Sequence, residues 1–219
     1  MMENKKFKYK IENKRYHTWN YYLREKFGTK VFKVSINAGF TCPNIDGSIS
    51  YGGCAYCSKD GSGDFAGNPR DNLVKQFKDI KEMMEKKWPQ AKYIGYFQAF
   101  TNTYAPLEVL KDKYETILDQ DGVVGLSIST RPDCIDDDIL DYLAELNTRT
   151  NLWVELGLQT VHDQTSNIIN RGHGLDVFVD CVNRLRSREI EVVAHVINGL
   201  PGETYDMMME TIRRVSHMD

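Results

Sequence analysis

Residues 32–57 read FKVSINAGFTCPNIDGSISYGGCAYC, and this stretch decides both the fold and the chemistry of the chain. Its first residues, with the preceding Val31, are rich in β-branched side chains and predict a strand over residues 31–36. A glycine-rich segment follows at once and carries three of the five cysteines, Cys42, Cys54 and Cys57, in the spacing C-x11-C-x2-C. Clustered thiols on a loop that leaves a strand predict a metal site at the carboxyl end of that strand.

The number of thiols in this loop narrows the kind of metal site. Gly47, Gly52 and Gly53 permit the positive φ values that bring the three cysteines to one centre. A structural zinc site takes four ligands, but the loop offers three thiols, and no histidine lies between residues 18 and 161. Three thiolates fit a [4Fe-4S] cluster that keeps one iron free for a small ligand. The alternative is a zinc site completed by Cys134, Cys181 or a distant histidine.

Outside this loop, strand-like and helix-like runs alternate along the chain. Strands are expected over residues 31–36, 93–97, 123–129, 152–158 and 190–197. Helices are expected over residues 70–88, 106–118, 136–146, 163–170, 175–187 and 203–217. This order predicts an α/β fold with a parallel sheet, either open and doubly wound or a barrel or partial barrel. In each case functional loops lie at the carboxyl ends of the strands, and the long loop over residues 37–69 is expected to have a function.

Composition excludes several classes of protein. The chain has 219 residues, of which 41% are hydrophobic and 27% charged, as in ordinary globular proteins. No window approaches the roughly 18 consecutive apolar residues of a membrane span, and the charged N-terminus is unlike a signal peptide. The odd number of cysteines argues against a disulfide framework. We therefore expect a cytoplasmic protein that has no membrane partner.

The N-terminal region is strongly basic, although the whole chain has a formal net charge of −3. Residues 1–33 contain three glutamates against ten cations: Lys5, Lys6, Lys8, Lys10, Lys14, Arg15, Arg24, Lys26, Lys30 and Lys33. Aromatic side chains lie among them, at Phe7, Tyr9, Tyr16, Trp19, Tyr21 and Tyr22. Such a region can contact RNA through phosphates and stacked bases. The alternatives are a solvated chain end and an amphipathic helix packed on the core, and we expect residues 1–30 to pack there.

Several segments together resemble the radical S-adenosylmethionine (radical SAM) superfamily. They are residues 32–57, GSGDFAG (61–67), GYFQAFTNTYAP (95–106), SISTRPDC (127–134), VELGLQT (154–160) and INGLPGET (197–204). The match is similar in detail to the YhcC/YtqA-like branch, which is related to the elongator catalytic subunit and to oxygen-independent coproporphyrinogen oxidase. The commonest spacing in the superfamily is C-x3-C-x2-C. This chain departs from that spacing but keeps an aromatic residue, Tyr56, before the last cysteine.

The resemblance implies a fold and a class of reaction. The fold is a partial (βα)-barrel of about five to six parallel strands, with the core over residues 31–219 and a C-terminal part absent. Cys42, Cys54 and Cys57 would ligate three irons of a [4Fe-4S] cluster, and SAM would chelate the fourth. Reductive cleavage of SAM then gives a 5′-deoxyadenosyl radical that abstracts hydrogen from a substrate. The electron donor would be a protein such as flavodoxin or ferredoxin.

The resemblance also implies SAM contacts, position by position. Tyr56 would lie against the adenine, and the backbone of Gln98, Ala99 and Thr101 would meet the SAM amino group. Ser129 would touch the ribose. Gln159 and Arg171 match a glutamine-to-arginine spacing in which the arginine pairs with the SAM carboxylate, and His195 occupies a position that is aspartate in those relatives. Purely structural roles are the alternative for some of these residues. Arg171 could cap a helix, and Glu155, within a strand, could pair with a basic residue.

The substrate is less constrained than the cofactors. The relationship to the elongator subunit and the basic N-terminal region favour RNA, and specifically the modification of a tRNA wobble uridine. A small-molecule or protein substrate is the alternative. A different class of function would be a zinc-stabilised nucleic-acid-binding module without redox chemistry, which uses the same thiols and the same basic residues.

Overall fold

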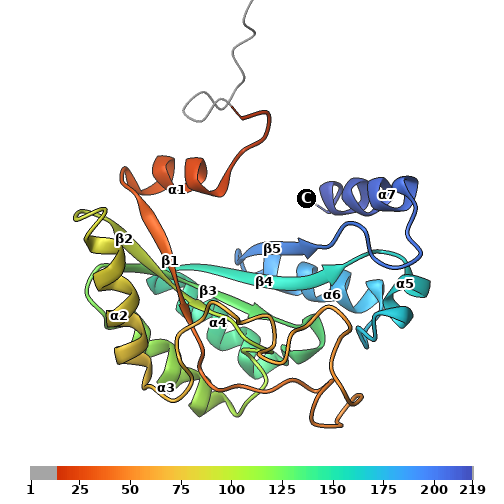
Figure 1. The fold of residues 1–219 in the computed structure, drawn as a ribbon, viewed down its shortest axis with the longest axis horizontal. Coiled ribbons are helices and arrows are strands. Elements are labelled where there is room, and N and C mark those ends of the chain that lie inside the picture. The colour runs from red at the N-terminus through yellow and green to blue at the C-terminus, as the bar shows by residue number, and fades with distance from the viewer. Residues whose placement is uncertain (1–13, 219) are drawn as a thin grey trace, which may run out of the picture.

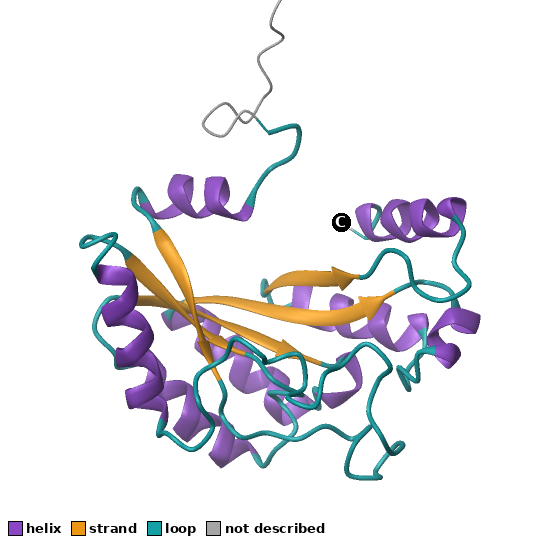
Figure 2. Cartoon of the chain, in the orientation of Figure 1, coloured by secondary structure: helices purple, strands orange, loops and turns teal. Residues whose placement is uncertain are grey.

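A parallel five-stranded sheet with the strand order β1-β2-β3-β4-β5 forms the centre of the fold (Figures 1 and 2). The computed structural model describes residues 14–218. The strands are β1 (Val31–Ile36), β2 (Lys92–Phe97), β3 (Val123–Thr130), β4 (Asn151–Gln159) and β5 (Glu191–Val196). All neighbouring strands pair in parallel. The α/β fold and the five predicted strands are confirmed.

Helices connect the strands. They are α1 (Trp19–Phe27), α2 (Leu73–Glu85), α3 (Leu107–Leu118), α4 (Asp137–Arg149), α5 (Asp163–Ile168), α6 (Leu175–Arg186) and α7 (Tyr205–Ser216), with a 3-10 turn at Pro132–Cys134. Side chains cap the start of α1, α2, α4 and α7. The side chain of Asn72 accepts a hydrogen bond from the Lys75 amide at the start of α2. This cap explains why α2 begins later than residue 70, where hydrophobic periodicity alone had placed its start. None of the described helices is long and apolar enough to span a membrane.

Alternation along each strand gives the sheet an outer and an inner face. On β4, Leu152, Val154, Leu156 and Leu158 belong to the main hydrophobic core, which also contains residues of α2, α3, α4 and α6. The side chains between them point to the opposite, inner face, because successive residues of a strand face opposite sides. The inner face therefore carries the remaining residues of each strand, and many of them are polar.

Helix α1 covers one end of the inner face. Its Leu23 is buried in a small apolar cluster with Val31, Ile94 and Trp153, and Trp19 packs edge-on against Trp153 at 5.3 Å between ring centroids. The described part of the basic N-terminal region thus packs on the sheet, although local periodicity did not identify this helix. Residues 1–13, which include Lys5, Lys6, Lys8, Lys10, Phe7 and Tyr9, lie outside the described residues.

Candidate functional site

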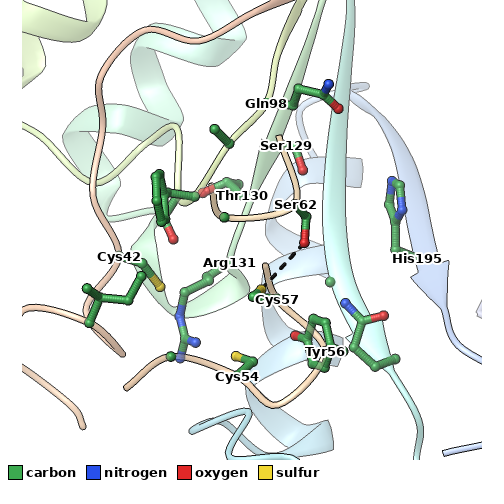
Figure 3. Close-up of a pocket in the computed structure, with 18 of the residues that line it drawn as sticks. Cys42, Cys54, Tyr56, Cys57, Ser62, Gln98, Ser129, Thr130, Arg131 and His195 are labelled. Carbon is green, nitrogen blue, oxygen red and sulfur yellow. Dashed lines mark hydrogen bonds between the residues drawn. The ribbon is translucent and has the colours of Figure 1, made fainter. Parts of the chain in front are cut away.

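A cavity of about 300 Å³ opens where the strands end, between the sheet and the cysteine loop (Figure 3). Every strand or its following loop contributes a side chain. The lining includes ten residues singled out in the sequence: Cys42, Cys54, Tyr56, Cys57, Gln98, Ala99, Thr101, Ser129, Gln159 and His195. The carboxyl ends of parallel strands meet at one edge of a sheet, which explains why residues so distant in the chain gather here.

Two asparagines fasten the cysteine loop to the connection between α5 and α6. The side-chain amide of Asn44 donates to the carbonyls of Asn170 at 2.7 Å and Arg171 at 3.0 Å. In return, the side chain of Asn170 donates to the carbonyl of Gly53 at 2.8 Å, and the Ala55 amide donates to the Ile169 carbonyl at 2.9 Å. The loop is therefore held in place by hydrogen bonds although it contains neither helix nor strand.

The carbonyl of Arg171 is a shared acceptor for two segments of the site. It accepts the Asn44 amide at 3.0 Å and also Nη1 of Arg131 at 2.8 Å. Arg131 follows β3, lines the cavity, and forms a bidentate pair with Asp133 at 2.9 and 2.6 Å. Asn44, Arg131 and Arg171 are all buried. One buried carbonyl thus joins the cysteine loop, the end of β3 and the α5–α6 connection.

Polar contacts also act directly on the thiols. The Asn44 amide donates to Sγ of Cys54 at 3.3 Å, and the Ser62 hydroxyl donates to Sγ of Cys57 at 3.5 Å. A hydrogen bond from Cys57, with smaller contributions from Tyr56, Asn44 and the charge of Arg131, lowers the pKa of Cys54 to about 6, against the effect of burial. The bond to Cys54 and burial raise the pKa of Cys57. Of the two thiols, Cys54 therefore loses its proton more easily.

The donor set suits a cluster with several irons better than a single ion. Among residues 14–218, no three His, Cys, Asp or Glu side chains come together closely enough to hold one metal ion. The thiolates of a cubane cluster bind separate irons and need not converge on one atom. Three thiols around a cavity, one with a lowered pKa, therefore fit a [4Fe-4S] cluster, and the arrangement gives no support to the zinc-stabilised module.

The turn after β2 is strained and packs against the cysteine loop. Ala99 and Phe100 adopt positive φ values of 79° and 60°, a conformation that costs non-glycine residues free energy. The amide of Phe100 donates to the Gly61 carbonyl at 3.0 Å, and that of Thr101 donates to the Thr41 carbonyl at 3.1 Å. A Cβ at Gly61 would lie 2.4 Å from the Phe100 ring, so glycine is required there.

The end of β4 places an unsatisfied polar atom at the cavity. Gln159 has a φ of 65° beside an irregularity in the β4–β5 register. Its Oε1 is buried and accepts no hydrogen bond within the described chain. A ligand that donates a hydrogen bond would satisfy this oxygen, whose isolation otherwise costs free energy. A SAM molecule, with its amino and hydroxyl donors, fits this requirement.

Arg171 is the one predicted site residue that does not line the cavity. Its side chain is fully buried, and the guanidinium donates to the carbonyls of Leu158, Thr160 at 2.6 Å and His173 at 3.0 and 2.9 Å. The expected position facing a ligand carboxylate is therefore not what the structure shows. The backbone of Arg171 does cap a helix, because its amide donates to the Ser166 carbonyl in α5 at 3.1 Å, next to Gly172. The side chain of Arg171 fixes the backbone at the end of β4, next to Gln159.

Sequence reasoning missed two residues that the site depends on. Arg131 stands directly after the third strand, and its position at a strand end was the available signal. Asn44 lies two residues after Cys42, but the two carbonyls that it fastens, of Asn170 and Arg171, lie more than a hundred positions away, so no local pattern could have identified this role. The pairing of Glu155 with a basic residue was foreseen, and the structure identifies that residue as Lys33.

The lowered pKa of Cys54 predicts selective alkylation of the metal-free protein. The thiolate attacks iodoacetamide and displaces iodide, so modification of Cys54 should rise through about pH 6. Burial raises the pKa values of Cys134 and Cys181 to about 12, and both should stay unmodified at pH 7. Mass spectrometry of peptides after short alkylation pulses measures this. Equal rates at Cys54 and Cys134 would contradict the electrostatic analysis.

The role of Asn44 predicts local opening of the loop in Asn44→Ala. Removing a buried hydrogen-bonding group costs roughly 1–3 kcal/mol, so amide exchange at Gly53 and Ala55 should quicken by about 5- to 150-fold. Hydrogen–deuterium exchange with mass spectrometry measures the change. Ser48→Ala is the matched control, because Ser48 is exposed in the same loop and its hydroxyl bonds to Tyr104 and to the nearby Asp46 side chain, not to the α5–α6 connection. Exchange that is equal in the two variants would refute this role.

Comparison with known proteins gives close relatives over the whole chain. The chain is 60% identical to the uncharacterized protein YtqA of Bacillus subtilis (strain 168) over 219 residues, which are 100% of this chain and 68% of that protein. It is 38% identical to protein YhcC of Escherichia coli (strain K12) over 88% of this chain and 62% of that protein. The chain thus spans about two thirds of the length of these relatives.

More distant matches agree in fold. The solved structure of Elp3 from the archaeon Methanocaldococcus infernus, with an N-terminal deletion, has a TM-score of 0.57 at 16% identity and covers 84% of this chain and 42% of that one. The tRNA uridine(34) acetyltransferase of the same species is 25% identical over 92 residues, 42% of this chain and 17% of that protein. The family model of the Radical SAM superfamily matches residues 49–215. The chain therefore belongs to the radical SAM superfamily, in the branch that contains YtqA and YhcC.

Proposed function

We propose that this chain holds a [4Fe-4S] cluster and SAM in the cavity at the carboxyl edge of its sheet and performs radical chemistry on an RNA substrate. The observation that carries the proposal is the gathering of Cys42, Cys54 and Cys57 around one cavity in a chain of this superfamily. When bound, the cluster and SAM supply a 5′-deoxyadenosyl radical for hydrogen abstraction.

The three cysteines are the proposed cluster ligands, and their surroundings favour that role. Asn44 and Ser62 donate hydrogen bonds to two of the sulfurs, and such bonds tune the reduction potential of a cluster. The Arg131 guanidinium adds positive charge near Cys54. An electron donor such as flavodoxin or ferredoxin would supply the reducing equivalent.

The proposed SAM contacts come from four strand ends. Gln159 offers an acceptor that lacks a donor within the described chain, and the strained turn Gln98–Thr101 lines the cavity. Ser129 and Tyr56 line the same space and would meet the ribose and the adenine. Arg171 contributes by fixing the β4 end that carries Gln159, rather than by touching the ligand. His195 completes the wall on β5.

The substrate proposal is a tRNA wobble uridine. It is supported by the distant relative whose name assigns it to uridine 34 of tRNA. Part of the basic N-terminal region makes contacts within the fold. Lys33 pairs with Glu155, Lys26 pairs with Glu191 at 2.8 Å, and Trp19 packs on Trp153. RNA contacts would therefore fall on exposed cations such as Arg24 and on the cavity rim.

Anaerobic reconstitution with iron and sulfide tests the cofactor proposal. The protein should bind about four irons, turn brown, and show a reduced EPR signal that changes when SAM is added. Cys54→Ala should lose the cluster, because a ligand is removed. Cys134→Ala is the matched control, since Cys134 lies outside the proposed ligand set, and it should keep both iron and signal. A colourless protein with one zinc would overturn the proposal.

A comparison of tRNA nucleosides tests the substrate proposal. Loss of the gene should change one nucleoside at the wobble position, and the reconstituted protein with SAM and dithionite should alter that nucleoside in tRNA from the deletion strain. Digestion and mass spectrometry provide the measurement, and the Cys54→Ala variant is the control for cluster dependence. Unchanged tRNA in the deletion strain would reject RNA as the substrate.

A further inference from the structure

A buried charged cluster lies on the inner face of the sheet, between the apolar layer under α1 and the cavity. Its members are Lys33 on β1, Ser127 on β3, Glu155 on β4 and His195 on β5. The Glu155 side chain is only 2% exposed, whereas that of His195 is 45% exposed and lines the cavity. The cofactor proposal places His195 on the cavity wall but gives Lys33, Ser127 and Glu155 no role, and burying a charged group costs free energy that such pairing must offset.

The carboxylate of Glu155 is fully engaged. One oxygen accepts hydrogen bonds from Nζ of Lys33 and Oγ of Ser127, and the other is 2.7 Å from Nε2 of His195. Burial raises the pKa of Glu155, but the bond from His195, the charge of Lys33 and the bond from Ser127 outweigh it and lower that pKa to about 2. Glu155 is therefore ionised throughout the physiological range.

Other charged groups near the cluster do not disturb this state. Lys33 balances the charge of Glu155, and its ammonium also lies over the rings of Tyr96 at 4.3 Å and Trp19 at 5.1 Å. Burial and the nearby Glu155 charge raise the pKa of Tyr96, so its hydroxyl stays neutral. The pair of Lys33 and Glu155 has no net charge, and His195 is the member of the cluster that lines the cavity.

The contact with Glu155 fixes the tautomer of His195. An ionised carboxylate only accepts hydrogen bonds, so Nε2 of His195 carries the proton. Nδ1 of the ring has no hydrogen-bond partner among residues 14–218, and its lone pair is available to a group in the cavity. A carboxylate that orients an imidazole while the other nitrogen stays open is the arrangement of a general base.

We propose that His195 is the proton-transfer residue of this site, with Glu155 as the residue that positions it. Nδ1 would take a proton from an N–H or O–H group of the bound substrate. The electron pair of that bond stays on the substrate, and Glu155 stabilises the imidazolium that forms. Return of the proton to product or water restores the neutral ring. This inference rests on the proposed function, because it needs a substrate in the cavity.

The first part of the test examines the tautomer and needs no substrate. Nitrogen NMR of protein labelled with 15N-histidine, assigned with His195→Gln, should show a proton on Nε2 and none on Nδ1 at neutral pH. Glu155→Gln should mix the two tautomers, because an amide can donate as well as accept. A proton on Nδ1 in the unmodified protein would overturn the proposal whatever reaction the protein performs.

The second part measures coupling in the reconstituted protein, with tRNA from the deletion strain as probe. The yield of altered nucleoside per 5′-deoxyadenosine should fall by about 100-fold in His195→Gln. The yield of His195→Gly should be partly rescued by added imidazole. His162→Gln is the control, because that ring binds the Met207 carbonyl away from the cavity, and it should match the unmodified protein.

The outcomes distinguish failure of the His195 assignment from failure of the proposed function. An unmodified protein that forms no 5′-deoxyadenosine refutes the proposed function, and the assignment of His195 falls with it. Normal 5′-deoxyadenosine formation with an unchanged yield in His195→Gln refutes the proton-transfer role alone. An unchanged yield together with a tenfold weaker SAM affinity would instead assign His195 to SAM binding, which also refutes it.

Discussion

The site depends on one buried carbonyl, that of Arg171. It accepts hydrogen bonds from Asn44 in the cysteine loop and from Arg131 after β3, while the side chain of the same residue holds the end of β4. A loop without helix or strand has no continuous backbone ladder, so isolated backbone bonds, such as that from the Gly53 amide to the Asn44 carbonyl, and these side-chain bonds together define its shape. The relative positions of the three thiols and of Gln159 therefore follow from this junction.

This junction lies at the edge of a sheet whose two faces carry different kinds of side chain. Leucine and valine side chains on the outer face form the core with the helices, and the inner face is left for an apolar layer under α1, a charged layer around Glu155 and the cavity above it. The charged layer around Glu155 borders the cavity through His195 and so limits how far a ligand can extend along the inner face. Within this arrangement Lys33 pairs with Glu155, and Lys26 pairs with Glu191.

The strands were predictable from sequence because their β-branched and apolar runs are bounded by glycine and proline, and the gathering of ten cavity residues followed from parallel topology. The cysteine loop was predictable as a candidate metal site from its three cysteines. Helix α1 was foreseen only as one alternative for the basic N-terminal region and without bounds, since its apolar positions are few and mixed with aromatic and basic residues. Asn44, Arg131 and the inward turn of Arg171 depend on contacts between distant segments, which no local pattern records. The partner of Glu155 was predictable in kind but not in identity.

The central claim is that three cysteines leave one iron of a [4Fe-4S] cluster open to SAM. Mössbauer spectroscopy of protein reconstituted with 57Fe tests it most directly, because each iron contributes to the spectrum. The account predicts that SAM alters the spectrum of one iron in four and leaves the three thiolate-bound irons unchanged. A spectrum in which SAM changes none of the irons, or in which all four respond alike, would contradict it.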